Sequence, residues 1–188
     1  MSLKTHLVEA ASLLNASATD ALEEKMARAV EAIATALAQN KVLLVGGNGG
    51  SASDALHIAG ELVAQFTKKR RALKAICLGA NMAALTAWAN DHSYDTAYAR
   101  QVEAFGEPGG VLLALSTSGN SKNVIAALER ARALGMTTIG MTGEGGGKMA
   151  GLCDILLEAP SRSTPAIQQV HICLYHHLCA EVEARFEA

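Results

Sequence analysis

Residues 42–61 read VLLVGGNGGSASDALHIAGE, and the class of fold can be inferred from them. A short apolar run leads through a Gly-Gly-Asn-Gly-Gly-Ser loop into a segment with helical character. A buried strand that turns through glycines into a helix is the opening unit of an α/β domain. On that helix, His57 and Glu61 lie four residues apart, so their side chains are only about 40° apart around the axis. The stretch therefore predicts an anion-binding loop beside an imidazole and a carboxylate.

Short apolar runs further along predict the rest of a parallel sheet. The five expected strands are residues 42–45, 75–78, 111–115, 137–141 and 155–158. Helix-capable segments separate them, which is the βαβ rhythm of a three-layer α/β domain. Ahead of them, apolar residues at three- and four-residue steps predict a helix over residues 19–39, with a shorter helical pattern before it. We expect a three-layer α/β/α sandwich with a central parallel sheet, preceded by an N-terminal helical hairpin.

The composition indicates one soluble globular domain. With 188 residues, 50% of them hydrophobic, the chain can bury a core, so we interpret residues 1–188 as one domain with residues 1–40 as a helical extension. The net charge of −2 gives no field that favours nucleic acid or a membrane surface, and neither is expected as a partner. The start of the chain lacks a secretory pattern, and the four cysteines show no CxxC pairing. These features predict a cytoplasmic protein with reduced thiols.

A second strand–loop–helix unit follows residues 111–115, where the sequence STSGNS occupies residues 116–121. Free backbone N–H groups at a helix start, together with hydroxyl donors, bind phosphate without needing lysine. The same residue types are also ordinary caps and turn formers. Ligands of open parallel sheets bind at the carboxyl ends of the strands, where both loops belong. Since neither loop has a nucleotide fingerprint, a small phosphorylated metabolite is the expected ligand.

The C-terminal helix supplies further polar groups. Its predicted apolar stripe leaves Gln168, His171, His176 and His177 on the other faces, and Pro165 falls in its first turn. A single helical histidine is more often a structural or surface residue than a ligand. His57, Glu61, Gln168 and one of these histidines can converge only if this helix packs beside the Gly-rich loop.

Five motifs in this order resemble the phosphoheptose isomerases of the sugar isomerase (SIS) domain superfamily. They are GNGGS, H-x-x-x-E, N-D, STSGNS and T-P-x-I-Q-x-x-H-x-x-x-x-H, and they run over nearly the whole chain. STSGNS alone would indicate only an SIS domain, whereas the added histidine, glutamate and glutamine positions are more specific. The resemblance implies an SIS fold and a homotetramer with sites between subunits. It also implies conversion of sedoheptulose 7-phosphate to D-glycero-D-manno-heptose 7-phosphate, a step toward bacterial lipopolysaccharide.

The resemblance also implies roles for individual residues. Glu61 is the expected base and His176 its acid/base partner, while His57, Glu61, Gln168 and His176 would hold one zinc ion per subunit. The residues expected to bind the sugar phosphate are Asn48, Gly49, Gly50, Ser51, Asn90, Asp91, Ser116, Thr117, Ser118, Ser121 and Gln168. Isomerisation through an enediol needs groups that move protons between carbons and oxygens, each contributing about 10²–10⁴-fold. Zinc could polarise the carbonyl, although glutamine is an uncommon zinc ligand.

Some residues stand apart from the resemblance. Pro165-Ala166 replaces a segment where family members often carry Asp or Arg. His171 and His177 are interpreted as structural or supporting residues, and Asp54 and Asp95 as caps or surface carboxylates. The basic run at residues 68–71 is interpreted as a solvated loop.

Three alternative functions stay open. A related SIS branch binds the bacterial replication initiator without sugar chemistry, but it lacks the His/Glu/His set. A sugar-phosphate sensor would usually accompany a further module, for which no residues remain. An isomerase of another phosphosugar also fits, because phosphate binding is generic.

Overall fold

Five parallel strands form the central sheet in a computed structural model that describes residues 2–187. The strands are β1 (Leu43–Gly47), β2 (Ala75–Cys77), β3 (Val111–Ser116), β4 (Thr137–Thr142) and β5 (Ile155–Glu158). Their order is β2-β1-β3-β4-β5. The central strands β1 and β3 are buried along their whole length, as expected for apolar runs covered on both faces. All five predicted strands are present, with small shifts at their ends.

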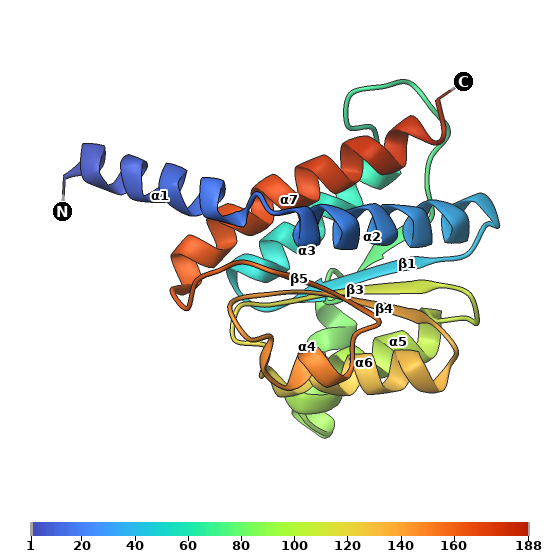
Figure 1. Cartoon of the computed structure of the whole chain (residues 1–188). Coiled ribbons are helices and arrows are strands. Elements are labelled where there is room, and N and C mark those ends of the chain that lie inside the picture. The colour runs from blue at the N-terminus through green and yellow to red at the C-terminus, as the bar shows by residue number, and fades with distance from the viewer. Residues whose placement is uncertain (1, 188) are drawn as a thin grey trace.

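Helices cover both faces of this sheet, which confirms the predicted three-layer architecture (Figure 1). The helices are α1 (Leu3–Ser17), α2 (Asp20–Ala38), α3 (Gly50–Val63), α4 (Met82–Asp91), α5 (Ala97–Phe105), α6 (Lys122–Ala133) and α7 (Thr164–Ala184), with short 3₁₀ turns η1 (Tyr94–Thr96) and η2 (Gly147–Gly151). Helices α2, α3 and α7 pack on one face, and α5 and α6 on the other. Among residues 2–187, no helix has both the length and the apolar character needed to cross a membrane.

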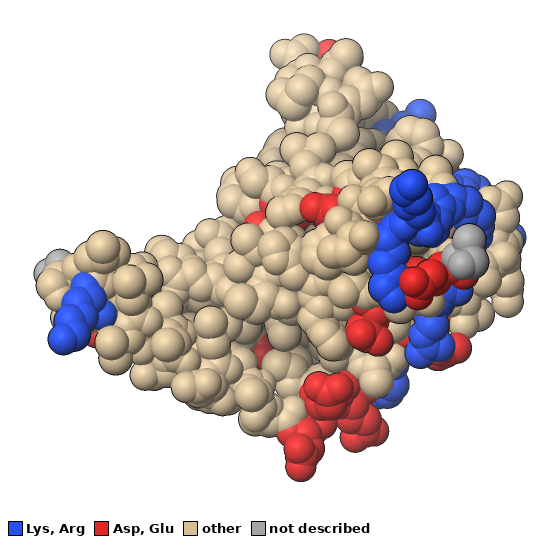
Figure 2. Space-filling model, turned by 90° about the horizontal axis from the view of Figure 1, so that it is seen from above, with Lys and Arg blue, Asp and Glu red and all other residues tan. Residues whose placement is uncertain are grey.

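The two consecutive N-terminal helices differ in how they are packed. Helix α2 begins after Thr19, whose hydroxyl accepts from the Leu22 N–H, and it buries Met26, Ile33 and other residues of its predicted stripe. Helix α1 extends outward beyond the sheet, and Leu3 and Leu7 on it are 73% and 58% exposed (Figure 1). In Figure 2 this arm is largely uncharged, while charged side chains gather at the opposite end. The apolar surface of the first half of α1 is thus left uncovered, whereas Leu13 and Leu14 near its end pack against α7.

The sheet order places one crevice between β1 and β3. From β1 the chain crosses to β2 on one side, whereas β3 continues to β4 and β5 on the other side. The loops after β1 and β3 therefore diverge at the carboxyl ends of adjacent strands, where open α/β sheets bind ligands. Gly49, with φ +57°, makes the turn from β1 into α3 in a conformation that side chains rarely adopt.

Candidate active site

A cavity of about 280 Å³ opens at this crevice. Its lining combines the loop after β1, the loop after β3 and the first turns of α7: Asn48, Gly49, Gly50, Ser51, Leu115, Ser116, Thr117, Ser121, Thr164 and Gln168. The Gln168 amide lies so close to Gly50 that a Cβ there would meet its Nε2 at 2.5 Å. A side chain at residue 50 would therefore displace the Gln168 amide from its place beside the loop. The structure brings eight of the predicted sugar-phosphate residues to one cavity, including Gln168 from the far end of the sequence.

The hydroxyl groups of the second loop are arranged toward this cavity. Ser116 and Ser121 are 3.0 Å apart through their Oγ atoms, and the Thr117 and Thr164 hydroxyls are 3.2 Å apart. Ser121 is the N-cap residue of α6, yet its side chain makes no capping hydrogen bond. The capping interpretation therefore does not account for Ser121. Ser118 differs, because its hydroxyl accepts from the Asn120 N–H within the loop and it lies outside the cavity lining.

Asn48 is held by residues that the sequence patterns did not single out. Its amide exchanges two hydrogen bonds with the buried Asn123 amide, at 2.8 and 2.9 Å, and its Oδ1 also accepts from Tyr94 Oη at 2.8 Å. Three hydrogen bonds to these two residues leave the Asn48 side chain little freedom. No spacing rule links Asn123 or Tyr94 to Asn48, so only the fold reveals this support.

A second cluster lies further along α3 and α7. The Nε2 atom of His57 is 2.9 Å from Glu61 Oε1, and Nδ1 of the same ring is 3.1 Å from Tyr175 Oη. The His176 ring stands edge-on to the His57 ring, with centroids 5.2 Å apart, and Phe66 packs against His176. We call these five residues the ring cluster. It contains both predicted catalytic residues.

Helices α3 and α7 run side by side in the same direction, because Gly50 meets Gln168 near their starts and His57 meets Tyr175 further on. At about 1.5 Å per residue, His57 lies roughly 9 Å along α3 from Ser51. The cavity and the ring cluster are therefore neighbouring parts of one two-helix site. Gln168 belongs to the cavity end of this site, two turns of α7 before His176.

Asn90 and Asp91 lie elsewhere in this single chain. Both are exposed at the end of α4, where Asn90 Nδ2 donates to Asp91 Oδ1, and neither lines the cavity. No side chain of α4 is buried within the chain itself. The substrate roles expected of these two residues stay predictions.

The chemistry of a metal site is present, but a preformed cage is not. Among residues 2–187, no three His, Cys, Asp or Glu side chains gather closely enough to hold a metal ion. Imidazole nitrogen and carboxylate oxygen are nonetheless normal zinc donors, and His57 Nε2 and Glu61 Oε1 face each other directly. The donor atoms of His57, Glu61 and His176 are of the kinds that bind zinc. Gln168, the fourth predicted ligand, lies instead at the cavity, two turns of α7 away from His176.

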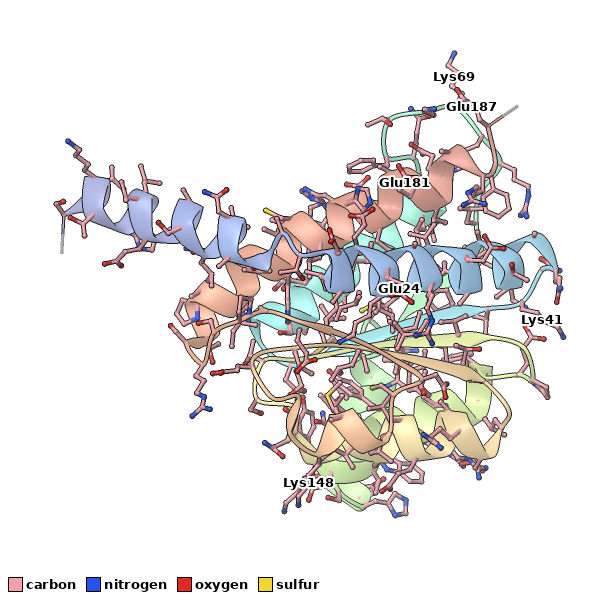
Figure 3. The ribbon with its side chains drawn as sticks, in the orientation of Figure 1. Glu24, Lys41, Lys69, Lys148, Glu181 and Glu187 are labelled. Atoms are coloured by element: carbon pink, nitrogen blue, oxygen red, sulfur yellow. The ribbon has the colours of Figure 1, made fainter. Side chains whose placement is uncertain are left out.

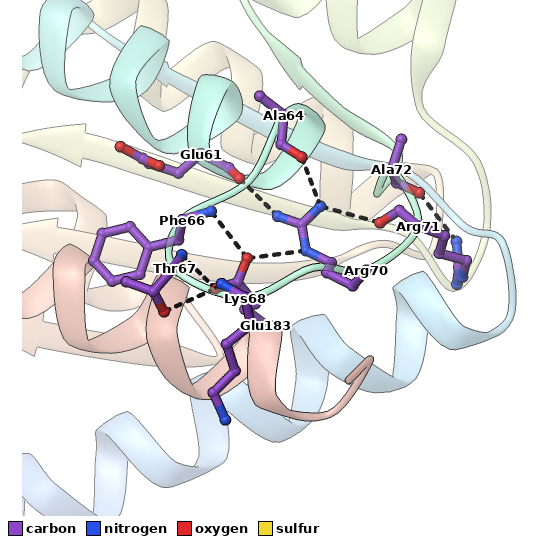
Figure 4. Close-up of polar contacts among 9 residues, drawn as sticks. All are labelled: Glu61, Ala64, Phe66, Thr67, Lys68, Arg70, Arg71, Ala72 and Glu183. Atoms are coloured by element: carbon purple, nitrogen blue, oxygen red, sulfur yellow. Dashed lines mark hydrogen bonds and ion pairs between the residues drawn. The ribbon is translucent and has the colours of Figure 1, made fainter. Parts of the chain in front are cut away.

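The loop between α3 and β2 is anchored by a buried ion pair (Figure 4). Glu183 on α7 accepts from the backbone N–H groups of Phe66, Thr67 and Lys68 at 2.9, 2.7 and 2.8 Å. Arg70 Nε is 3.3 Å from Glu183, with both side chains fully buried, and its Nη2 donates to the Glu61 carbonyl at 2.7 Å. The interpretation of residues 68–71 as a solvated loop is thus wrong for Arg70. Lys69 does point into solvent near Glu187 (Figure 3).

Other predicted residues take structural places. His171 is buried and its Nε2 lies 3.1 Å from the Thr142 carbonyl oxygen; burial lowers its pKa. His177 is exposed on α7. Asp95 pairs on the surface with Lys122. Asp54, interpreted above as a cap or surface carboxylate, is instead half-buried and accepts from Tyr175 Oη at 3.3 Å.

Comparison with known proteins agrees with this fold. The SIS domain family matches residues 6–143, so the crevice and its loops define an SIS domain. A phosphoheptose isomerase of Crocosphaera subtropica is 52% identical over 146 residues, covering 78% of this chain and 74% of the relative. One of Bradyrhizobium sp. (strain BTAi1) is 46% identical over 183 residues, covering 97% and 92%. The phosphoheptose isomerase GmhA from Neisseria gonorrhoeae superposes with a TM-score of 0.90 at 36% identity, covering 97% of both chains. The chain belongs to the phosphoheptose isomerases, a family of SIS-domain enzymes.

Proposed function

We propose that this protein isomerises sedoheptulose 7-phosphate to D-glycero-D-manno-heptose 7-phosphate, in the synthesis of heptose for bacterial lipopolysaccharide. The observation that carries the proposal is the joint position of the hydroxyl-lined cavity and the ring cluster along α3 and α7. Such a site can hold a phosphate at one end and a reactive carbon at the other. Several similar proteins named phosphoheptose isomerase support the assignment.

The proposed chemistry assigns one task to each part of the site. Ser116, Thr117 and Ser121 bind the phosphate through neutral donors. Glu61 removes a proton from one carbon and returns it to the adjacent carbon. Its carboxylate is available for this task because, among the described residues, it pairs only with His57, through one oxygen, and can accept further hydrogens. His176 exchanges protons with the two oxygens, so that an enediol forms and collapses to the aldose.

We further propose that zinc binds at the ring cluster. His57, Glu61 and His176 would supply the ligands, and Gln168 is the fourth residue that the family resemblance implies. A zinc ion held there would polarise a substrate carbonyl and stabilise negative charge on its oxygen. Elemental analysis after mild purification is expected to find about one zinc per subunit in the wild type and loss of zinc in His57→Ala.

The exposed apolar helices support a homotetramer in the cytoplasm as a further proposal. Leu3 and Leu7 on α1 and Met82 on α4 are each more than half exposed, which is costly for large apolar side chains in a monomer. The four cysteines are free, as suits a reducing compartment. Light scattering coupled to gel filtration measures the assembly directly; a monomer at micromolar concentration would contradict it.

The decisive experiment is an isomerase assay with sedoheptulose 7-phosphate beside shorter ketose phosphates. We expect turnover of the seven-carbon substrate and a large loss in His176→Ala. Turnover of only a shorter sugar would assign a different phosphosugar isomerase. Absence of turnover with every substrate would favour the non-enzymatic adaptor.

A further inference from the structure

Tyr175 joins the protein core to the ring cluster. Its side chain is 1% exposed and packs in the same core cluster as Ile58 and Leu178. Its ring stands edge-on to the His57 ring, with centroids 5.4 Å apart. Its hydroxyl oxygen lies 3.1 Å from His57 Nδ1 and 3.3 Å from Asp54 Oδ1. A buried phenol normally uses its hydroxyl for hydrogen bonds, and here both partners come from one face of α3.

The single phenolic proton decides the direction of this hydrogen-bond chain. A phenol ordinarily keeps its proton up to about pH 10, and the Tyr175 hydroxyl donates to Asp54 Oδ1 at 3.3 Å. Burial raises the pKa of Asp54, and the hydrogen bond from Tyr175 and the nearby His57 offset only part of this rise. An ionised carboxylate can only accept, so the phenolic proton points to Asp54. The phenol oxygen is then left as the acceptor for a hydrogen on His57 Nδ1.

The protonation of Nδ1 determines what the other ring nitrogen presents. In a neutral histidine, one nitrogen carries the hydrogen and the other carries a lone pair. With the hydrogen on Nδ1, the lone pair of Nε2 points toward Glu61 Oε1, 2.9 Å away. Two acceptor atoms at this distance need a positive charge between them, either a proton or a metal ion.

We propose that Tyr175, with its proton directed to Asp54, is the positioning residue that sets the tautomer of His57. It thereby presents the Nε2 lone pair to the position shared with Glu61. Metal-ligating histidines are commonly oriented by a partner on the opposite ring nitrogen, and Tyr175 occupies that place. The use of this position for zinc rests on the proposed function, whereas the order of the hydrogen bonds does not. In the opposite order, a neutral Asp54 would donate to the phenol, and Nε2 would donate to Glu61.

Nitrogen NMR of ¹⁵N-histidine-labelled, metal-free protein distinguishes the two orders. The spectrum is recorded at about pH 8, above the ordinary histidine pKa, and the His57 signals are identified by their absence in His57→Gln. We expect a hydrogen on Nδ1 of His57 in the wild type and its transfer to Nε2 in Tyr175→Phe. A wild-type Nδ1 without hydrogen, or an identical pattern in Tyr175→Phe, would overturn the proposal.

Zinc affinity gives a second readout that does not depend on turnover. Competition with a chromophoric chelator is expected to show about 10–100-fold weaker binding in Tyr175→Phe and a smaller loss in Asp54→Asn. Tyr98→Phe is the matched control, because it removes a buried phenol that donates to the Gly47 carbonyl on the other side of the sheet. Equal affinity of Tyr175→Phe and wild type would contradict the proposal. If the wild type takes up no zinc, the metal part of the proposed function fails, and the NMR result alone decides the role of Tyr175.

Discussion

Glu61 and Glu183 are two carboxylates beside the loop that joins α3 to β2, and their surroundings differ sharply. The Glu183 carboxylate is fully buried, accepts from three backbone N–H groups and the Thr67 hydroxyl, and forms an ion pair with the Arg70 guanidinium. Glu61 is 22% exposed, and its carboxylate pairs with His57 alone among the described contacts. A carboxylate can accept about four hydrogen bonds, so Glu183 is saturated and Glu61 is open. The difference indicates that Glu183 stabilises the fold while Glu61 is available to a reactant.

Loss of the open carboxylate of Glu61 should lower turnover more than any other change considered. Glu61→Gln keeps the shape of the side chain but removes the base, so turnover should fall by about 10²–10⁴-fold. The thermal midpoint should stay close to that of the wild type, because few contacts of the carboxylate are lost. Steady-state kinetics and calorimetry measure both quantities. A variant with wild-type turnover would show that Glu61 is not the base.

At Glu183, the saturated carboxylate, loss of the charge should lower stability much more than turnover. Glu183→Gln leaves Arg70 buried without its counter-charge, and breaking a buried pair in this way costs about 3–5 kcal/mol of unfolding free energy. The turnover of molecules that remain folded should change less than tenfold, since Glu183 lies outside the ring cluster. Urea unfolding together with active-site-normalised kinetics checks both. Equal stability of variant and wild type would mean that the buried pair adds nothing to the fold.

Acid should lower the free energy of unfolding through protonation of Glu183. Burial alone raises the pKa of Glu183, but the N–H groups of Thr67, Phe66 and Lys68 outweigh burial and lower it below its ordinary value of 4.5. A carboxylate with a depressed pKa in the folded state contributes stability above its ordinary pKa and loses it as pH falls through the folded value. Unfolding free energy should therefore decrease below about pH 4.5 with a slope of up to roughly 1.4 kcal/mol per pH unit from this group. Glu183→Gln should remove that part of the slope; an unchanged slope would assign acid sensitivity to other groups.

The smallest effect concerns the geometry of the anchor. Arg70→Lys keeps the positive charge but loses the planar fork that donates to the carbonyls of Glu61, Ala64 and Arg71. We expect a loss of about 1–3 kcal/mol, less than for Glu183→Gln. Lys68→Ala, which removes only an exposed pair with Glu187, is the control and should leave the unfolding midpoint unchanged. Equal effects of the two changes would place Arg70 among ordinary surface charges.

The sheet could be predicted from the sequence because its determinants are local. Apolar runs between helix-capable segments mark buried parallel strands, and every such run forms a strand. The four-residue spacing of His57 and Glu61 similarly placed them on one face of α3, where they meet. The rule that ligands bind at the carboxyl ends of strands predicted that the two loops share one site, and both line the same cavity.

The parts that could not be predicted depend on contacts between distant elements. Tyr175 is one residue before His176, yet its role arises only because α3 lies beside α7. Arg70 belongs to a run of four basic residues, which is usually solvated, and its partner Glu183 stands more than a hundred residues later. The outward direction of α1 has no local signal either, because Leu3 and Leu7 are exposed and only the end of the helix packs against α7.

The parallel course of α3 and α7 has a consequence for how the site can change. Each residue inserted into a helix advances it by about 1.5 Å but also rotates it by about 100°, so a one-residue insertion between Ser51 and His57 would turn both His57 and Glu61 away from Tyr175 on α7. Only insertions near a whole turn, about 5.4 Å, preserve the facing side chains. The distance along α3 from the cavity to Glu61 can therefore change only in steps of about one helical turn. Point substitutions can reshape either end of the site while leaving this distance unchanged.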